Sequence, residues 1–178
     1  MTRRRWEVFV AIAMGLALAF VGFDLLNGPV RDLETTVVLA LLAPLGQRSS
    51  GLPNHVFQVL PTDHPAFRAE LTPYCSSLIS LLALAAIALF VLHGSLPRRV
   101  FALGAAMLLV LMANVLRVTG SLLVGYAFGD RTLVLFHDWA GTLFALAYTM
   151  GGFFLMLFLL LPSASARIPR AARVSDVL

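Results

Sequence analysis

The sequence is short of charge and of cysteine. Only 12% of its 178 residues are charged, about half the share of an ordinary soluble domain, whereas 60% are apolar and the mean hydropathy is +0.90. A chain with so few charges could not cover a globule with polar surface, which excludes a soluble enzyme, a disordered tail and a disulfide scaffold. Its single cysteine allows no intramolecular disulfide, so cysteine usage leaves the redox compartment open. The composition therefore predicts an integral membrane protein.

The sequence also has no lysine, and its 13 basic residues are all arginine. The net charge of +4 and the isoelectric point near 10.2 raise the question of nucleic-acid binding. A protein of that kind gathers its basic residues on a solvated face, but here they lie beside apolar runs. We therefore expect membrane lipids, and no nucleic acid, as partners.

Four apolar stretches predict transmembrane helices, because about 20 helical residues are needed to cross a hydrocarbon layer about 30 Å thick. They cover residues 8–26, 75–92, 100–123 and 133–161. The first stretch resembles a cleavable signal, but its apolar core is long and no clear cleavage site follows, which favours a retained anchor. The expected fold class is all-α integral membrane, with a single transmembrane domain at 1–162 and a cytoplasmic tail at 163–178.

Arginine placement predicts the orientation of the chain. If every stretch spans, the arginines at 3–5, at 98 and 99, and in the tail fall on one side, which the positive-inside rule makes cytoplasmic. Both termini are then cytoplasmic, and residues 27–73 and 128–136 are outer segments. The expected location is the cytoplasmic (inner) membrane, as a multi-pass protein.

Apolar residues recur every four positions in the long outer segment and predict an amphipathic helix on the outer face, lying at the interface. Its expected bounds are a cap near Asp32 and an end at Pro44 or Gly46. The recurring residues are Leu33, Val37, Leu41 and Leu45.

Two short runs further along the outer segment predict strands. Residues 56–60 and 67–71 are separated by Pro-Thr-Asp-His-Pro, a sequence typical of a turn. The expectation is a short hairpin.

Three reactive side chains are predicted to arrive at one depth. Cys75 begins the second stretch and His137 begins the fourth, both at the outer end. Arg117 lies 17 residues beyond Val100, which at 1.5 Å per residue is about 26 Å from the inner face. A shared site at the outer boundary is therefore possible.

Cys75 is expected in the first helical turn, with Thr72 as N-cap and Pro73 at the first helical position. A helix N-terminus and a cationic neighbour acidify a thiol, and the thiolate is the nucleophile. The alternative is that Cys75 is a small hydrophobe in an apolar chain.

Arg117 places a permanent charge inside an apolar stretch at a cost of at least about 2.5 kcal/mol, so a function or a partner usually holds it. It could bind a substrate carboxylate or carbonyl, stabilise the Cys75 thiolate, or donate to an oxyanion. Asn114 and Ser121 lie on the same helical face, and either could orient the guanidinium. Alternatively, Arg117 snorkels to the outer headgroups.

His137 carries the side chain suited to moving protons near neutral pH. Gly141, one turn deeper on the same face, permits close helix approach. Asp138 points about 100° away around the helix and is a poor orienting partner. The alternative is a polar residue that marks the membrane surface.

Together these residues give the sequence a resemblance to the exosortase/archaeosortase family of membrane-embedded cysteine transpeptidases. The likeness rests on T-P-Y-C-S-S-L at 72–78, N-V-L-R-V at 114–118 and H-D-W-A-G-T-L-F at 137–144. It implies Cys75, Arg117 and His137 as catalytic residues and a thioacyl intermediate. It also implies exported protein substrates with a C-terminal sorting signal, which consists of a short motif, a transmembrane helix and a basic cluster. The chain departs from the family in having Ser77 where a glycine is frequent, and in having fewer spans than many members.

Two alternatives stay open at this point. The chain could be a non-catalytic membrane subunit or small carrier, with Arg117 as a structural or substrate-binding charge. It could also hold a metal at Cys75 with His55, His64 or His137, although no pair has the close spacing of a zinc motif. We expect no metal and no cofactor.

Overall fold

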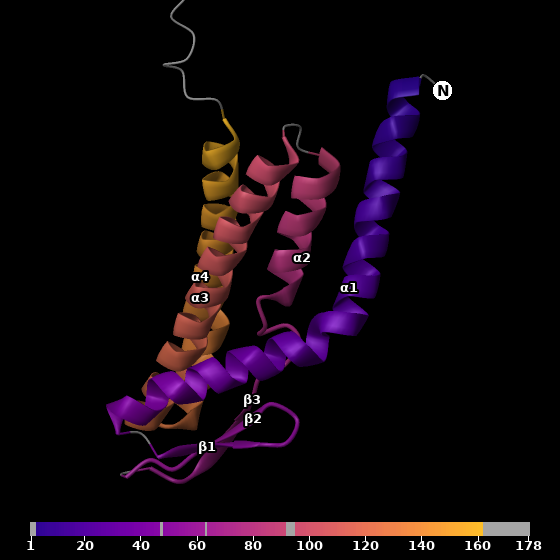
Figure 1. Ribbon diagram of the computed structural model, residues 1–178. Coiled ribbons are helices and arrows are strands. Elements are labelled where there is room, and N and C mark those ends of the chain that lie inside the picture. The colour runs from indigo at the N-terminus through magenta and orange to yellow at the C-terminus, as the bar shows by residue number, and fades with distance from the viewer. Residues whose placement is uncertain (1–2, 47, 63, 92–94, 162–178) are drawn as a thin grey trace, which may run out of the picture.

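The computed structural model is a bundle of four helices with a small antiparallel sheet at one end (Figure 1). It describes residues 3–46, 48–62, 64–91 and 95–161, and the predicted tail at 163–178 lies outside them. The helices are α1 (Arg3–Leu42), α2 (Leu78–Ala86), α3 (Leu96–Phe128) and α4 (Asp130–Leu160); the strands are β1 (Ser49–Leu52), β2 (Val56–Val59) and β3 (Phe67–Glu70).

Three apolar segments are long enough to cross a membrane, which agrees with a multi-pass membrane protein. They are Ile12–Leu45, Leu96–Phe128 and Asp130–Leu160. The expected span at 75–92 contains a shorter apolar helix, Leu78–Phe90, whose length of about 20 Å at 1.5 Å per residue is less than the hydrocarbon thickness. The count of four spans is therefore not confirmed.

Helix α1 joins two elements that the sequence analysis separated. It runs without a break from Arg3 to Leu42, with Pro29 inside, so the separate helix starting near Asp32 is wrong. Proline removes one helical hydrogen bond and bends a helix without ending it when packing supports both sides. In Figure 1 the first part of α1 stands beside α2, and the second part turns to run between the bundle and the sheet. The expected end of this helix agrees with a short 3₁₀ turn that closes at Gly46, where φ is 71°.

The second part of α1 buries a different face from the one its leucines mark. Leu33, Leu41 and Leu45 are exposed by 49%, 38% and 53%. Arg31, Glu34, Val38 and Leu42 are buried instead, at the spacing of one helical face. The leucine stripe is thus an outward surface, as expected where lipid replaces water.

The expected hairpin is present as β2 and β3, and a third strand was missed. The order is β1-β2-β3, all antiparallel, with Phe57 opposite both Gly51 and Ala69. Strand β1 has the sequence Ser-Ser-Gly-Leu, which has little strand propensity. Phe57 and Val59 point into a core that includes residues of α1 and α3, so the sheet is packed on the end of the bundle.

Helices α3 and α4 are joined by a single residue, Gly129, whose φ is 88°. Most of the expected outer segment at 128–136 is therefore helical, because α4 already begins at Asp130. Small residues let the two helices pack closely. A Cβ on Gly152 would lie 2.7 Å from Val110 Cγ2 and 3.4 Å from Ala106 O.

Candidate active site

Cys75 lies in the connection between β3 and α2, in a segment of residues 71–77 that we call the Cys75 loop. The expectation that it occupies the first helical turn is wrong, because α2 begins at Leu78. The Cys75 amide instead closes a turn by donating to Thr72 O at 3.0 Å. Thr72 Oγ1 donates to Cys75 Sγ at 3.1 Å, so a side-chain hydroxyl takes the place expected for helical N–H groups.

His137 lies about two turns inside α4, and its Nε2 is 3.2 Å from Cys75 Sγ. On the other side of the ring, Nδ1 is 3.5 Å from Ser121 Oγ. Ser121 donates its only proton to Arg117 O at 2.9 Å, so its oxygen is left to accept from Nδ1. This arrangement favours the tautomer with the proton on Nδ1, which leaves Nε2 free to exchange a proton with the sulfur.

Arg117 is only 9% exposed, so it does not snorkel to the surface. Its Nη2 donates to Cys75 O at 2.8 Å and its Nη1 to Gly141 O at 3.3 Å. Among the described residues Nε has no partner and is buried. The guanidinium therefore binds the backbone carbonyl of Cys75, and its Nε–H donor is left without a partner among the described residues.

The three neighbours named with the catalytic candidates act differently from expectation. Asn114 does not touch the guanidinium but shares its acceptor, donating to Cys75 O at 3.1 Å. Ser121 Oγ donates to the backbone carbonyl oxygen of Arg117 and does not orient the guanidinium group. Gly141 contributes a carbonyl, and a Cβ there would lie 3.8 Å from its nearest neighbours, so its lack of a side chain is not required for close approach.

The surroundings of Cys75 favour its thiolate. Burial raises the pKa of the thiol, but hydrogen bonds with His137 and Thr72 and the positive charges of His137 and Arg117 lower it, from 9.0 to about 7. A substantial thiolate fraction is thus present near neutral pH. Because thiolate is the reactive form, the geometry is suited to nucleophilic chemistry.

Glu34 belongs to this site, although the sequence analysis assigned it no role. It is 0% exposed. Its Oε1 accepts from Ser77 N at 2.9 Å, from Ser77 Oγ at 2.6 Å and from Asn114 Nδ2 at 2.9 Å. Tyr148 completes the network by donating to Asn114 Oδ1 at 3.0 Å. The available signal was an acidic residue within the helical pattern of α1, three residues after an arginine.

Arg31 is that arginine, and it also reaches the Cys75 loop. It is 8% exposed, its Nε donates to Leu71 O at 2.6 Å, and its Nη2 lies 3.6 Å from Glu70 Oε1. The N-terminal helix thus contributes two buried charges of opposite sign to the surroundings of the nucleophile.

The histidines considered for a metal site are engaged elsewhere. His55 Nδ1 lies 3.1 Å from Asp32 Oδ1, and His64 Nε2 lies 3.0 Å from Ala127 O. In the described part of the chain, no three His, Cys, Asp or Glu side chains gather as metal ligands would.

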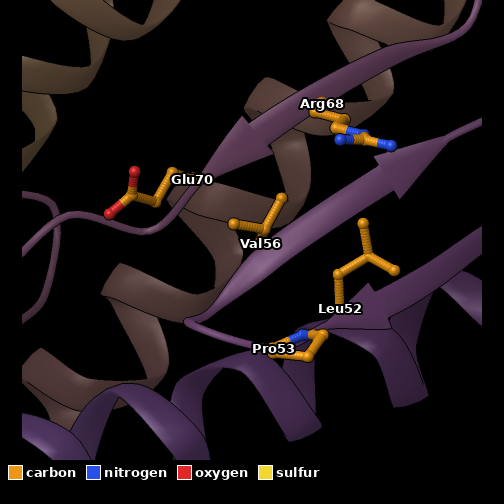
Figure 2. Close-up of a pocket in the computed structure, with 5 residues that line it drawn as sticks. All are labelled: Leu52, Pro53, Val56, Arg68 and Glu70. Carbon is orange, nitrogen blue, oxygen red and sulfur yellow. The ribbon is translucent and has the colours of Figure 1, made fainter.

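An open pocket of about 490 Å³ lies on the sheet (Figure 2). It is lined by Leu52, Pro53, Val56, Arg68 and Glu70. None of Cys75, Arg117 and His137 lines it, so the pocket does not mark the centre of the chemistry.

Comparison with known proteins gives one match. A family model described as transmembrane exosortase matches residues 2–161. No curated protein and no solved structure matches the chain.

Proposed function

The chain belongs to the transmembrane exosortase family, and from this premise we propose that it is a membrane cysteine protease or transpeptidase that cleaves C-terminal sorting signals of exported proteins. The observation that carries the proposal is the 3.2 Å contact between Cys75 Sγ and His137 Nε2, beside the buried guanidinium of Arg117. Nucleophile and base within hydrogen-bond reach are the requirement for covalent catalysis.

In the first step, Cys75 Sγ attacks the carbonyl carbon of the scissile peptide bond. The thiol proton moves to His137 Nε2, an S–C bond forms, and the carbonyl electron pair moves to oxygen. Collapse of this intermediate breaks the C–N bond, and His137 returns the proton to the leaving amine. The exported protein remains attached to Cys75 as a thioester, until an amine acceptor or water attacks the same carbon and releases the sulfur.

Arg117 has two tasks in this reaction. Its Nη2 bond to Cys75 O fixes the backbone of the nucleophile. The positive charge of its guanidinium beside Cys75 would also stabilise the negative charge that develops on the substrate oxygen.

The substrate class follows from the family and the placement of charge. A sorting signal with a short motif, a transmembrane helix and a basic cluster would present its motif at the outer face of the inner membrane. The start of α1, the start of α3 and the end of α4 lie at one end of the molecule, opposite the sheet (Figure 1). Arg98 and Arg99 lie at that first end, which supports a cytoplasmic assignment for it and for both termini. A membrane-impermeant maleimide should then label Cys75 from outside, whereas labelling from the cytoplasmic side alone would reverse the orientation.

Replacement of the nucleophile tests the reaction itself. In cells that also express a protein with such a signal, Cys75→Ala and Cys75→Ser should abolish the shift of the substrate to its shorter form on a gel. Both variants should insert at wild-type levels. Ser80→Ala is the matched control, because that hydroxyl bonds Thr149 and lies outside the site. Processing by Cys75→Ala would instead favour a non-catalytic membrane subunit or carrier.

A further inference from the structure

The Cys75 loop is held from both ends by α1, and this contact is separate from the three catalytic candidates. At the start of the loop, Arg31 Nε donates to Leu71 O at 2.6 Å. At its end, Glu34 Oε1 accepts from both the amide and the hydroxyl of Ser77. Arg31 and Glu34 are three residues apart and so lie on one face of one helical turn.

Glu34 also reaches the middle of the loop through Asn114. The two protons of Asn114 Nδ2 go to Glu34 Oε1 at 2.9 Å and to Cys75 O at 3.1 Å. Tyr148 donates to the remaining oxygen of the amide, so the amide can face only one way. The carboxylate therefore determines where Asn114 can hold the carbonyl of Cys75.

Helix packing alone does not explain these two residues. A buried carboxylate or guanidinium is costly unless hydrogen bonds compensate it, and an apolar pair of similar size would pack this turn without that cost. Glu34 is 0% exposed, and its Oε2 has no partner among the described residues. The bonds that it does make go to the Cys75 loop at Ser77 and to Asn114, which in turn donates to Cys75 O.

We propose that this turn of α1 is a positioning clamp for the nucleophile: Arg31 fixes the start of the Cys75 loop and Glu34 fixes its end, so that Cys75 Sγ stays against His137. Arg31 and Glu34 are positioning residues, and neither touches the sulfur in the described contacts. The inference rests on the proposed function for its link to catalysis, but the geometry of the clamp can be measured without any substrate.

The clamp predicts that the reach of residue 34 matters more than its charge. Glu34→Gln keeps an oxygen at the position of Oε1 and can accept the same bonds, although the charge is lost. Glu34→Asp keeps the charge but is shorter by one methylene and cannot reach Ser77 and Asn114 together. An electrostatic role would give the opposite ranking.

The readout is the pH midpoint for alkylation of Cys75 by iodoacetamide, in the full chain in detergent. Cys75 is the only cysteine, so every alkylated protein reports on it. The expected wild-type midpoint is about 7. We expect Glu34→Gln to stay near it and Glu34→Asp to rise by about one unit or more toward 9.0, as the sulfur moves away from His137. Substrate processing should fall in the same order.

Three further variants keep the test decisive. Thr36→Ala removes an exposed hydroxyl of α1 that donates to Asp32 O, and it should leave the midpoint unchanged. Ser77→Ala removes the 2.6 Å bond to Glu34 without opening a large cavity, so it should raise the midpoint even if Glu34→Asp fails to fold. Arg31→Lys, which has no donor at the position of Nε, should raise it as well.

The clamp is overturned if Ser77→Ala, Arg31→Lys and Glu34→Asp all keep the wild-type midpoint. It is also overturned if Glu34→Gln shifts the midpoint as far as Glu34→Asp, or if Thr36→Ala shifts it as far. A wild-type midpoint near 9.0, or processing by Cys75→Ala, counts instead against the proposed function. Failure of the clamp and failure of the proposed function therefore give different results.

Discussion

Removal of His137 should raise the pH at which Cys75 becomes reactive. The His137 contact is the largest of the effects that lower the pKa of this thiol, and burial opposes it. In wild type, alkylation should be slow at acidic pH, rise through a midpoint at about 7, and then level off as the thiolate saturates. In His137→Ala the curve should keep its shape and move toward 9.0.

The size of the effect decides which quantity to measure. A change in pKa from about 7 to 9.0 lowers the thiolate fraction at pH 7 from about one half to about one hundredth, a factor of about 50. A more basic thiolate is intrinsically more nucleophilic, by about eight-fold over two units with a Brønsted slope near 0.45. The net loss of rate at pH 7 is then only about six-fold, so the midpoint of the full pH curve is the sharper readout.

The assay uses timed iodoacetamide labelling of the full chain in detergent between pH 5 and 10, with mass spectrometry of the intact protein. Thr72→Val, which loses the hydroxyl donor to Sγ, should shift the midpoint in the same direction by a smaller amount. His64→Ala removes a histidine that bonds Ala127 O and should leave the curve unchanged. A wild-type midpoint near 9.0, or equal midpoints in wild type and His137→Ala, would refute the reasoning.

Two further substitutions have directions that the geometry determines. Arg117→Lys keeps the charge but cannot bridge Cys75 O and Gly141 O, so substrate processing should fall by about 10- to 100-fold, in line with one lost charge-assisted hydrogen bond; wild-type processing would show that a point charge is enough. Gly152→Ala places a Cβ 2.7 Å from Val110 Cγ2, so it should destabilise the α3–α4 packing by about 1–3 kcal/mol. In the control variant Gly141→Ala, the new Cβ lies no closer than 3.8 Å to its neighbours, so the protein should keep the wild-type melting temperature in detergent. Equal melting temperatures for Gly152→Ala and Gly141→Ala would contradict the α3–α4 packing.

Much of the fold was open to prediction because membrane helices must be long and apolar. The stretches at 100–123 and 133–161 correspond to α3 and α4. The short helix α2 was overestimated, since the apolar run that includes it begins in the Cys75 loop, before the helix. Hydropathy records where apolar residues occur and not where the backbone becomes helical.

The leucines of α1 do not mark the side that packs on the protein, for a physical reason. In water a leucine stripe marks the side that packs on the protein, because burial removes apolar surface from solvent. In lipid the apolar face gains nothing from packing inward, and polar groups that need partners turn toward the protein. Leu33, Leu41 and Leu45 therefore stay outside, and Arg31 and Glu34 go in.

Chemistry alone identified each of the candidate residues Cys75, Arg117 and His137. It did not identify the residues that hold them in position. A pairing such as Glu34 with Ser77 joins residues 43 positions apart, and no local pattern encodes it. Thr72 was noticed as a helix cap, and its contact with the sulfur depends on a turn that hydropathy does not show.

The distribution of hydrogen bonds around Cys75 fits what a nucleophile requires. Its carbonyl receives donors from Arg117 and Asn114, whereas among the described residues its sulfur has only Thr72 and His137 as partners. Strong bonds to the backbone fix the position of the residue, and weak bonds to sulfur leave the thiolate free to attack, because a thiolate held by strong donors would lose nucleophilicity along with basicity. Substitutions at Asn114 should therefore act by displacing the nucleophile, and substitutions at His137 and Thr72 by changing its acidity directly. Substitutions at Arg117 should do both, because its charge also lowers the pKa of the thiol.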